Sequence, residues 1–546
     1  MQLSTKRPSS GAIAKPIDRS GGSGGGFTTR SVSPKKDGKA TPAGLSKDAY
    51  LNDPAILAII QDIKNEFGEK MDGQGGKRPL LVSDVIDDQG HQYVNLVQKG
   101  GGVLGIALVG YTHILEQAGI RFIRMAGTSA GAINTSLFTA VGPDDNPKAV
   151  AKSGDLIQYL SELDMFSFVD GHPFAKWLIR NFISDTNFQG RIKKLLLGLV
   201  SILGLLFLAS IILLGLEWHW KWEYASLLTR TSFVLTGLSF LLVASVGNYL
   251  NRMLTRLKDS GYGINPGNAF LEWIKSRLDE NGVSTIDDLN AKASHLPADL
   301  KMRDGSPLTN KEMISDVTFI SSELVTQNKI EFPKMWCLFR SKADINQLHP
   351  GEFVRASMSI PFFFESHIIS NIPSKDPDVQ AAWKDTFGCL PNQIPGTVRF
   401  VDGGVLSNFP INIFYNSRIA EARLPSFGID LDDSDPNAAT GMGAASWSLG
   451  DYMGRMLNTI RFYYDKDFLL KNNVFARGVG KVNLQDKKFN WLDFFLADQT
   501  KLELFIQGAK AARDFLIGTE AQPGFDWEAY KVARREMYKA VELDKT

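Results

Sequence analysis

A serine and an aspartate, each set among glycines, are the residues best suited to chemistry in this 546-residue sequence. Ser129 lies in Gly127-Thr128-Ser129-Ala130-Gly131, which has the G-x-S-x-G pattern of a nucleophile elbow. Small flanking residues let a strand and a helix approach closely while the backbone turns at the serine. The pattern predicts that this turn pushes the Ser129 hydroxyl into the open, as nucleophilic attack on an acyl group requires.

The residues around the pentapeptide predict the elements that such an elbow needs. Phe122–Met125 is typical of a short strand, and Ala130–Ala140 is typical of a helix built from small residues. The first N–H groups of a helix have no partner within it, so the N–H of Ala130 is a candidate donor to a developing oxyanion. Small-residue pentapeptides also arise by chance, and GTSAG alone is equally compatible with a plain turn.

A second glycine element precedes the elbow. Tyr93–Gln98 predicts a buried strand, Gly100-Gly101-Gly102 follows it, and Gly105–Gln117 predicts a helix. Such a loop also occurs in dinucleotide-binding sites, which need an acidic residue about twenty positions further on, after the next strand. Here the next strand leads into the Ser129 turn instead. We therefore interpret Gly100, Gly101 and Gly102 as an oxyanion hole.

Asp402 is the candidate base. It ends a predicted strand, Thr397–Val401, and Gly403 and Gly404 follow it. In open α/β sheets functional groups gather at the carboxyl ends of the strands. An Asp-Gly pair is also a common turn, so the position alone does not decide its role.

The histidines limit the possible triads. In α/β-hydrolases the chain order is serine, then acid, then histidine. All seven histidines precede Asp402: His91, His113, His172, His219, His295, His349 and His367. Asp402 cannot be the acid of a triad in that order. A triad of Ser129, Asp344 and His367 stays open, although no local pattern marks these positions.

Three blocks in this order resemble the patatin-like phospholipase family: Gly100–Gly105, Gly127–Gly131 and Asp402–Gly404. Arg355–Pro361 and Asn408–Pro410 are also similar, and the resemblance covers roughly residues 93–415. It implies a Ser–Asp dyad without histidine and hydrolysis of lipid acyl esters. The fold we expect is a three-layer α/β domain with a mostly parallel central sheet.

The resemblance assigns roles to individual residues. Ser129 is the expected nucleophile and Asp402 the expected base, and the N–H groups of the triple-glycine loop and Ala130 form the expected oxyanion hole. The glycines that shape these motifs are Gly105, Gly127, Gly131, Gly403 and Gly404. Leu104 stands where many members of the family have Arg or Lys, so no cation is expected beside the oxyanion loop.

Composition narrows the class of protein. The formal net charge of +1 gives no indication of a nucleic-acid partner. Two cysteines, Cys337 and Cys389, exclude a disulfide framework, and we expect Cys337 in the core. Histidine and cysteine are too sparse for a metal-ligand cluster, and the chemistry above needs no metal or cofactor.

Two apolar runs interrupt the catalytic segment. Residues 195–216 and 231–250 carry no charge and are each long enough to cross a bilayer of about 30 Å. Basic residues flank the outer ends, and the connection 217–230 contains three tryptophans and a tyrosine. The positive-inside rule then predicts an integral membrane protein with two spans and its catalytic domain on the cytoplasmic side.

The rest of the chain completes the expected organisation. Residues 1–50 predict a disordered basic tail, 51–92 a helical lead-in, and 416–546 a strand and helical extension that packs on the catalytic domain 93–415. Further helices are expected over Asp53–Glu69 and Asn265–Leu278, and further strands over Val317–Val325, Lys334–Arg340 and Phe427–Leu431.

The sequence thus predicts a membrane-associated lipid acyl hydrolase of the phospholipase A or lysophospholipase type. Its expected partners are a membrane phospholipid or another acyl lipid, and the bilayer itself. Two alternatives stay open: a membrane-tethered esterase or thioesterase for soluble acyl substrates, and a non-catalytic lipid binder. The lipid head group and the oligomeric state are left open.

Overall fold

The computed structural model describes residues 45–68, 78–144, 147–171, 188–220, 225–259, 262–306, 313–416, 421–433, 465–486 and 489–543, and the single positions 308, 419, 456, 459 and 463. The basic tail expected over residues 1–50 lies outside these ranges up to residue 44. Lys47–Leu51 forms helix α1, in which Tyr50 is buried. The folded chain therefore begins before the boundary that the sequence indicated.

The described strands belong to one ten-stranded sheet. They are β1 (Val85–Ile86), β2 (Gln92–Gln98), β3 (Ile120–Thr128), β4 (Lys301–Met302), β5 (Val317–Glu323), β6 (Asn328–Phe332), β7 (His367–Ser370), β8 (Thr397–Asp402), β9 (Ser426–Asp432) and β10 (Val479–Asn483). β10, β9, β2, β3 and β5 lie side by side in this order and run parallel. The other strands pair antiparallel. The sheet is mixed, and the expected parallel arrangement holds for these five strands.

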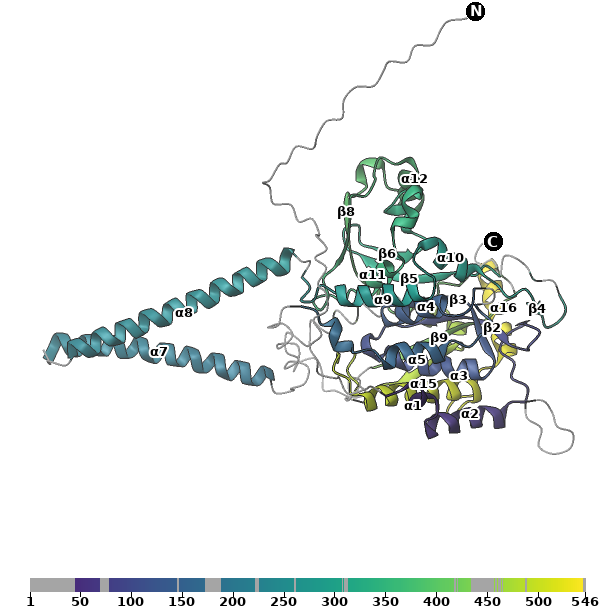
Figure 1. Cartoon of the computed structure of the whole chain (residues 1–546), viewed down its shortest axis with the longest axis horizontal. Coiled ribbons are helices and arrows are strands. Elements are labelled where there is room, and N and C mark those ends of the chain that lie inside the picture. Colours follow the sequence, from purple (N-terminus) through teal and green to yellow (C-terminus); the bar gives the residue numbers. More distant parts are fainter. Residues whose placement is uncertain are drawn as a thin grey trace, which may run out of the picture. The chain divides into compact units, whose positions relative to one another are not determined.

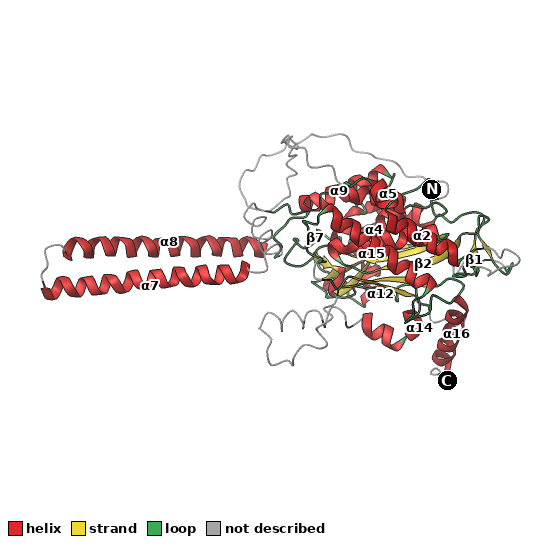
Figure 2. Ribbon diagram, turned by 90° about the horizontal axis from the view of Figure 1, so that it is seen from below, coloured by secondary structure: helices red, strands yellow, loops and turns green. Residues whose placement is uncertain are grey.

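Helices cover both faces of the sheet (Figures 1 and 2). They are α2 (Pro54–Glu66), α3 (Ile106–Gln117), α4 (Ala130–Ala140), α5 (Ser153–Ser161), α9 (Asn268–Glu280), α10 (Ile286–Ser294), α11 (Gly351–Ser357), α12 (Pro377–Phe387), α14 (Asn473–Ala476), α15 (Asp498–Ile517) and α16 (Trp527–Leu543). α4, α5 and α15 lie on one face, with α3 packed against α15 and α5, and α14 and α16 lie on the other face (Figure 2). On that second face Val97 and Ala126 of the sheet pack against Phe409, Phe414 and Phe475.

Two strands meet end to end along one edge of β5. Thr128, the last residue of β3, lies opposite Ile320, and Asp402, the last residue of β8, lies opposite Ser321. β6 pairs with residues 319–323 from the other edge, so β3 and β8 share the remaining one. They run toward each other, because β3 is parallel and β8 antiparallel to β5. Backbone pairing alone therefore brings the Ser129 turn and Asp402 together.

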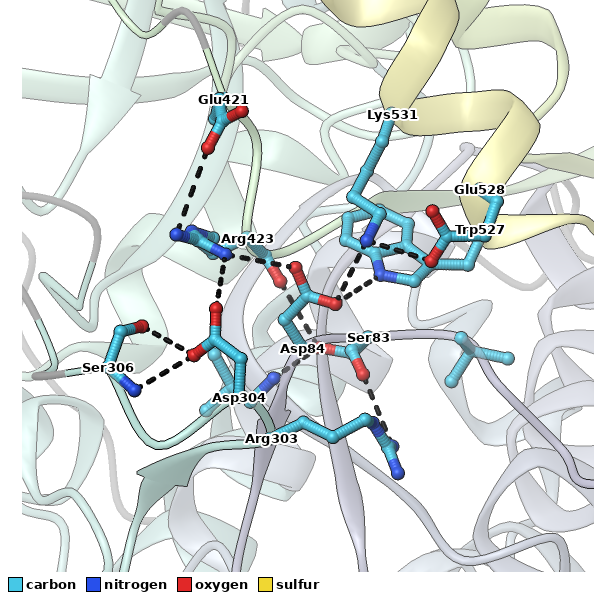
Figure 3. Close-up of polar contacts among 12 residues, drawn as sticks. Ser83, Asp84, Arg303, Asp304, Ser306, Glu421, Arg423, Trp527, Glu528 and Lys531 are labelled. Carbon is cyan, nitrogen blue, oxygen red and sulfur yellow. Dashed lines mark hydrogen bonds and ion pairs between the residues drawn. The ribbon is translucent and has the colours of Figure 1, made fainter.

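The C-terminal helices pack onto the N-terminal half of the chain, and Figure 3 shows one of the polar links. The carboxylate of Asp84, just before β1, accepts hydrogen bonds from the indole of Trp527 (2.7 Å) and the ammonium of Lys531 (3.3 Å) in α16. The guanidinium of Arg423 lies 3.5 Å from the other carboxylate oxygen and also contacts Asp304. These contacts join residues as much as 447 positions apart.

One predicted strand is wrong. Lys334–Arg340 contains a 3-10 turn, η3 (Trp336–Leu338), and the strand of this region is β6, which ends before it. Pro333 follows β6 and has no N–H to continue a ladder. Leu338 is fully buried nonetheless, so the apolar run reflects burial and not strand pairing. Cys337, expected in the core, is only partly buried.

Two long helices occupy the apolar segment: α7 (Phe188–Trp220) and α8 (Ala225–Asp259). They lie against each other as a pair (Figure 2). Within them Val200–His219 and Ser226–Tyr249 are long and apolar enough to cross a membrane. These ranges overlap the predicted spans at 195–216 and 231–250. Residues 221–224 of the predicted aromatic connection lie outside the described residues.

Candidate active site

Ser129 forms the turn between β3 and α4. Its φ of 54° and ψ of −118° lie where residues other than glycine are rarely found. Gly127 and Gly131 permit this turn, because a Cβ on Gly127 would lie 2.2 Å from the carbonyl oxygen of Gly131. The prediction of an open hydroxyl is wrong, since Ser129 is only 2% exposed. The glycine loop covers it: a Cβ on Gly100 would lie 3.1 Å from the Cβ of Ser129.

The strain at Ser129 leads to a stability prediction. Ser129→Gly should raise the free energy of unfolding above that of Ser129→Ala by roughly 1 kcal/mol, because glycine occupies positive φ without strain. Chemical denaturation of the two inactive variants measures the difference. Both lack the hydroxyl, so any loss of its contacts cancels. Equal stabilities would mean that the turn is relaxed in solution.

The last residue of α11 and the residues just after it hold the backbone of both Ser129 and Asp402. The N–H of Ser129 donates to the hydroxyl of Ser357 at 3.0 Å. The N–H of Asp402 donates to the carbonyl of Ser359 at 2.8 Å. A third bond, from the N–H of Gly404 to the Asp402 carboxylate at 2.7 Å, orients the acid itself. The sequence marked this segment only through its resemblance to a family and gave Ser357 and Ser359 no role.

Asp402 reaches the elbow by a different route from the one expected. The sequence placed it at the carboxyl edge of a parallel sheet, but β8 runs antiparallel to β5. It meets Ser129 because β8 stops opposite Ser321, one residue short of the position where β3 ends. Asp402 is 5% exposed, so a proton transfer there is shielded from bulk water.

In the triple-glycine loop, one N–H group has a hydrogen-bond acceptor among the described residues and two do not. Gly100 is held by Asn408: its N–H donates to the Asn408 carbonyl at 3.0 Å, and the Asn408 amide donates back to its carbonyl at 3.2 Å. The N–H groups of Gly101, Gly102 and Ala130 have no acceptor within the part of the chain that is described. Gly102 has a φ of 56°, which favours glycine. The N–H groups available to a ligand here are therefore those of Gly101, Gly102 and Ala130.

The remaining motif residues pack these elements together. A Cβ on Gly105 would lie 2.8 Å from the Cβ of Ala130, and one on Gly403 would lie 3.0 Å from Cγ2 of Thr128. Leu104, which stands where many members of the resembling family have Arg or Lys, is fully buried in the apolar core. The glycine loop, the elbow and the loop after Asp402 thus form one closely packed unit.

Asp465, which the sequence did not mark, supports this unit through hydrogen bonds to the loop after Asp402. Its carboxylate accepts hydrogen bonds from the Ser407 hydroxyl at 2.9 Å and the Phe409 N–H at 2.7 Å. These residues flank Asn408, the partner of Gly100. Burial raises the pKa of Asp465 to about 6, although the hydrogen bond from Phe409 opposes the shift. No pattern around residue 465 marks the position in the sequence, because its partners lie more than fifty residues away.

The raised pKa predicts how stability depends on pH. Well below pH 3.8 Asp465 is protonated in both folded and unfolded chains. Well above pH 6 it is ionised in both, at a cost to the folded state on the order of 3 kcal/mol. Asp465→Asn removes this cost and can accept from Phe409 and donate to Ser407. Its unfolding midpoint should exceed that of the wild type more at pH 7.5 than at pH 4.5. A less stable variant at pH 7.5 would show that the carboxylate's hydrogen bonds outweigh its burial.

An apolar cavity of about 60 Å³ opens beside Gly102 and Ala130. Among the residues that line it are Gly102, Ala130, Ile133, Phe270, Trp273 and Phe494. Asn134 is the one amide in the lining, and its Nδ2 donates to the carbonyl of Gly105 at 3.0 Å. The cavity therefore suits a hydrocarbon chain and offers a polar ligand little to bind.

The alternative triad is not assembled. His367 Nε2 lies 3.4 Å from the carboxylate of Glu352, and burial lowers the pKa of His367 to about 4. Asp344 accepts a hydrogen bond from Ser341 at 2.8 Å instead. Within the described residues no group of three or more His, Cys, Asp or Glu side chains could hold a metal ion.

Comparison with known proteins gives two sequence relatives. The chain is 26% identical over 432 residues to the uncharacterized protein YqhO of Bacillus subtilis (strain 168), covering 78% of this chain and 98% of that protein. It is 35% identical over 97 residues to the lysophospholipase nte1 of Aspergillus terreus (strain NIH 2624 / FGSC A1156), which is 16% of this chain and 6% of that protein.

The crystal structure of VipD from Legionella pneumophila aligns with 87% of this chain and 80% of its own, at 13% identity and a TM-score of 0.28. At that score the likeness supports no conclusion. A family model described as patatin-like phospholipase matches residues 96–415. This range includes most of the Ser129 turn's neighbouring strand β2 from Leu96 onward, the turn itself, Asp402 and Asn408, which is hydrogen-bonded to Gly100. The match covers more than half of the sequence, and the chain therefore belongs to the patatin-like phospholipase family.

Proposed function

We propose that the chain hydrolyses fatty-acyl esters of membrane lipids, as a phospholipase A or lysophospholipase, with Ser129 as nucleophile and Asp402 as base. The observation that carries this proposal is the meeting of β3 and β8 along one edge of β5. It puts a strained serine turn and a buried carboxylate at consecutive positions of the same edge. Membership of a lipid acyl hydrolase family supplies the substrate class.

In the proposed mechanism Asp402 takes the proton of the Ser129 hydroxyl as its oxygen attacks the ester carbonyl. The N–H groups of Gly101, Gly102 and Ala130 stabilise the negative charge on the tetrahedral intermediate. The intermediate collapses to an acyl-serine, and the proton passes from Asp402 to the departing alcohol. Asp402 then takes a proton from water as the water oxygen attacks the acyl-serine. The second intermediate collapses to the fatty acid, and the proton passes from Asp402 back to the departing Ser129 oxygen.

The apolar cavity supports an acyl substrate over a polar one. It is lined by Gly102 and Ala130, where the ester oxygen would be held, and also by Phe270 and Trp273. A hydrocarbon chain there would be removed from water, at a gain of about 0.8 kcal/mol per buried CH₂.

The α7–α8 pair supports a membrane location. Its interior is polar: the Ser210 hydroxyl lies 2.6 Å from that of Ser232 and 2.9 Å from that of Thr236, and all three are buried. Its surface is apolar, with Leu, Ile, Val and Phe side chains about half exposed along both helices. Polar contacts inside and apolar side chains outside suit a helix pair in lipid. We propose that it crosses the membrane twice, with the catalytic residues on the cytoplasmic side.

Two assays on the detergent-purified chain test this function. A fluorophosphonate probe should label the wild type and not Ser129→Ala, which separates an enzyme from a lipid binder. Phospholipids and lysophospholipids in mixed micelles should release fatty acid faster than short-chain esters and acyl thioesters at equal concentration. Labelling without lipid hydrolysis, together with turnover of short esters, would instead identify an esterase for soluble substrates.

A further inference from the structure

Two aromatic side chains project from the protein beside the candidate active site. Tyr262 is 55% exposed and Phe362 is 69% exposed. Both have left-handed backbones, with φ of 64° and 67°. A bulky residue in this conformation is strained by about 1 kcal/mol or more, and a glycine or asparagine would not be. Each position thus combines a strained backbone with an aromatic ring that is exposed to solvent.

The two residues belong to neighbouring segments. The N–H of Ile264 donates to the carbonyl of Phe362 at 3.2 Å, and the N–H of Asn265 donates to that of Phe363 at 3.0 Å. Asn265 also pairs with Phe364 as an isolated bridge. Tyr262 lies two residues before Ile264, and Phe362 pairs with Ile264, so both exposed rings come from the same end of the paired stretch.

The same two segments bound the apolar cavity. Ile360 lines it, and Phe363 stacks on the lining residue Phe494, with 4.5 Å between ring centroids and 10° between planes. The segment after Tyr262 leads into α9, whose Trp273 also lines it. The exposed rings therefore lie on the segments that form one wall of the cavity.

The chain around Tyr262 indicates what covers these rings. α8 ends at Asp259, three residues before Tyr262, and its apolar window is largely exposed. Arg252 and Lys258, in the last turns of α8, are exposed as well. Exposed basic side chains that shortly precede an exposed tyrosine in the sequence suit an interface with lipid head groups, where tyrosine and other aromatic residues concentrate. A protein partner bound at these rings would leave the exposed apolar surface of α8, just before Tyr262 in the chain, without an explanation.

We propose that Tyr262 and Phe362 insert together into the head-group region of a bilayer and hold the cavity entrance at its surface. A lipid tail can then pass from the bilayer toward Ser129 without crossing water. This inference rests on the proposed function for its substrate, but insertion of the two rings can be measured without catalysis.

Insertion can be tested with an environment-sensitive fluorophore. Phe362→Cys is labelled in a background with Cys337→Ser and Cys389→Ser, and the full chain is reconstituted in vesicles of phosphatidylcholine and phosphatidylserine. Leu57→Cys in α2, 49% exposed and remote from the cavity lining, is the matched control. Spin-labelled lipid should quench the label at position 362 and spare the label at position 57. Equal quenching at both positions would overturn the proposal. So would a label at position 362 whose shielding from water depends on protein concentration and not on lipid.

Activity supplies a second test. Tyr262→Asn with Phe362→Asn removes both rings, and asparagine tolerates the left-handed backbone. Hydrolysis of bilayer lipid should fall at least about ten-fold, because interfacial contact weakens with the apolar area lost. Turnover of a dispersed short-chain ester should change less than about two-fold, since the dyad and cavity are intact. Equal losses on both substrates would contradict the docking role. A wild type without any turnover would refute the proposed function, and the quenching experiment would still decide whether the rings insert.

Discussion

Replacing Asp402 by asparagine should lower acyl-ester turnover by about four orders of magnitude, because Ser129 then has no group to take its proton. Asparagine has nearly the same shape, and its amide oxygen can still accept the N–H of Gly404. The backbone bond from Asp402 to Ser359 is also unaffected by the change. The loss should therefore appear in kcat, with the unfolding midpoint close to that of the wild type.

The double variant makes this test sharper. If Ser129 and Asp402 act as one unit, Ser129→Ala with Asp402→Asn should be no slower than Ser129→Ala alone. His367→Gln and Asp344→Asn are the matched controls, since each replaces a residue of the alternative triad and neither residue lies in the candidate site. Both should keep most of the activity. A folded His367→Gln protein without turnover would show that the base is not Asp402.

The part of the site around Ser129 could be predicted closely from the sequence. The predicted helix over residues 130–140 has the observed bounds of α4, and the strand over 93–98 lies within β2. Local chemistry explains this success. Gly127 is required by a backbone contact four residues away, since a Cβ there would lie 2.2 Å from the carbonyl oxygen of Gly131, so this constraint is visible in the sequence beside the residue that it serves.

The relation of Ser129 to Asp402 could not be read in the same way. It depends on β3 and β8 sharing one edge of β5, and so on the register between strands that are far apart in the sequence: Thr128 pairs with Ile320, and Asp402 pairs with Ser321. A hydrophobic pattern reports which face of a strand is buried, not which neighbour it pairs with. Asp402 was identified by resemblance and by the lack of a later histidine, while its antiparallel approach had no local sign.

The supporting residues were missed for a related reason. Ser357 accepts a hydrogen bond from the N–H of Ser129, and Asp465 accepts two, from the Ser407 hydroxyl and the Phe409 N–H; all these donors lie far away in the sequence. Serine and aspartate at such positions look like ordinary polar residues of a loop or a helix. Their importance follows from burial, since an unpartnered N–H group at the elbow would cost about 1–3 kcal/mol.

Leu208→Arg should prevent stable membrane integration, and this is the variant with the second-largest expected effect. Leu208 lies near the middle of the apolar part of α7 and is 53% exposed. In lipid an arginine there costs about 2.5–3.5 kcal/mol on insertion scales. In water the same change at an exposed helical position would be nearly neutral, within about 0.5 kcal/mol. The two environments thus predict opposite outcomes from one substitution.

Extraction with alkaline carbonate measures the difference. Wild-type protein and the apolar control Leu208→Phe should stay in the membrane pellet, and Leu208→Arg should move largely to the soluble or degraded fraction. The polar interior of the pair supplies a second comparison. Ser210→Ala removes the hydroxyl that contacts both Ser232 and Thr236, yet it should leave integration unchanged, because each lost contact is worth only about 0.6 kcal/mol in a membrane. If Leu208→Arg remained in the pellet as fully as the wild type, α7 would not cross the bilayer. The proposed topology, with Ser129 and Asp402 on the cytoplasmic side, would then have no basis, whereas the dyad chemistry would stand, since none of its residues lies in α7 or α8.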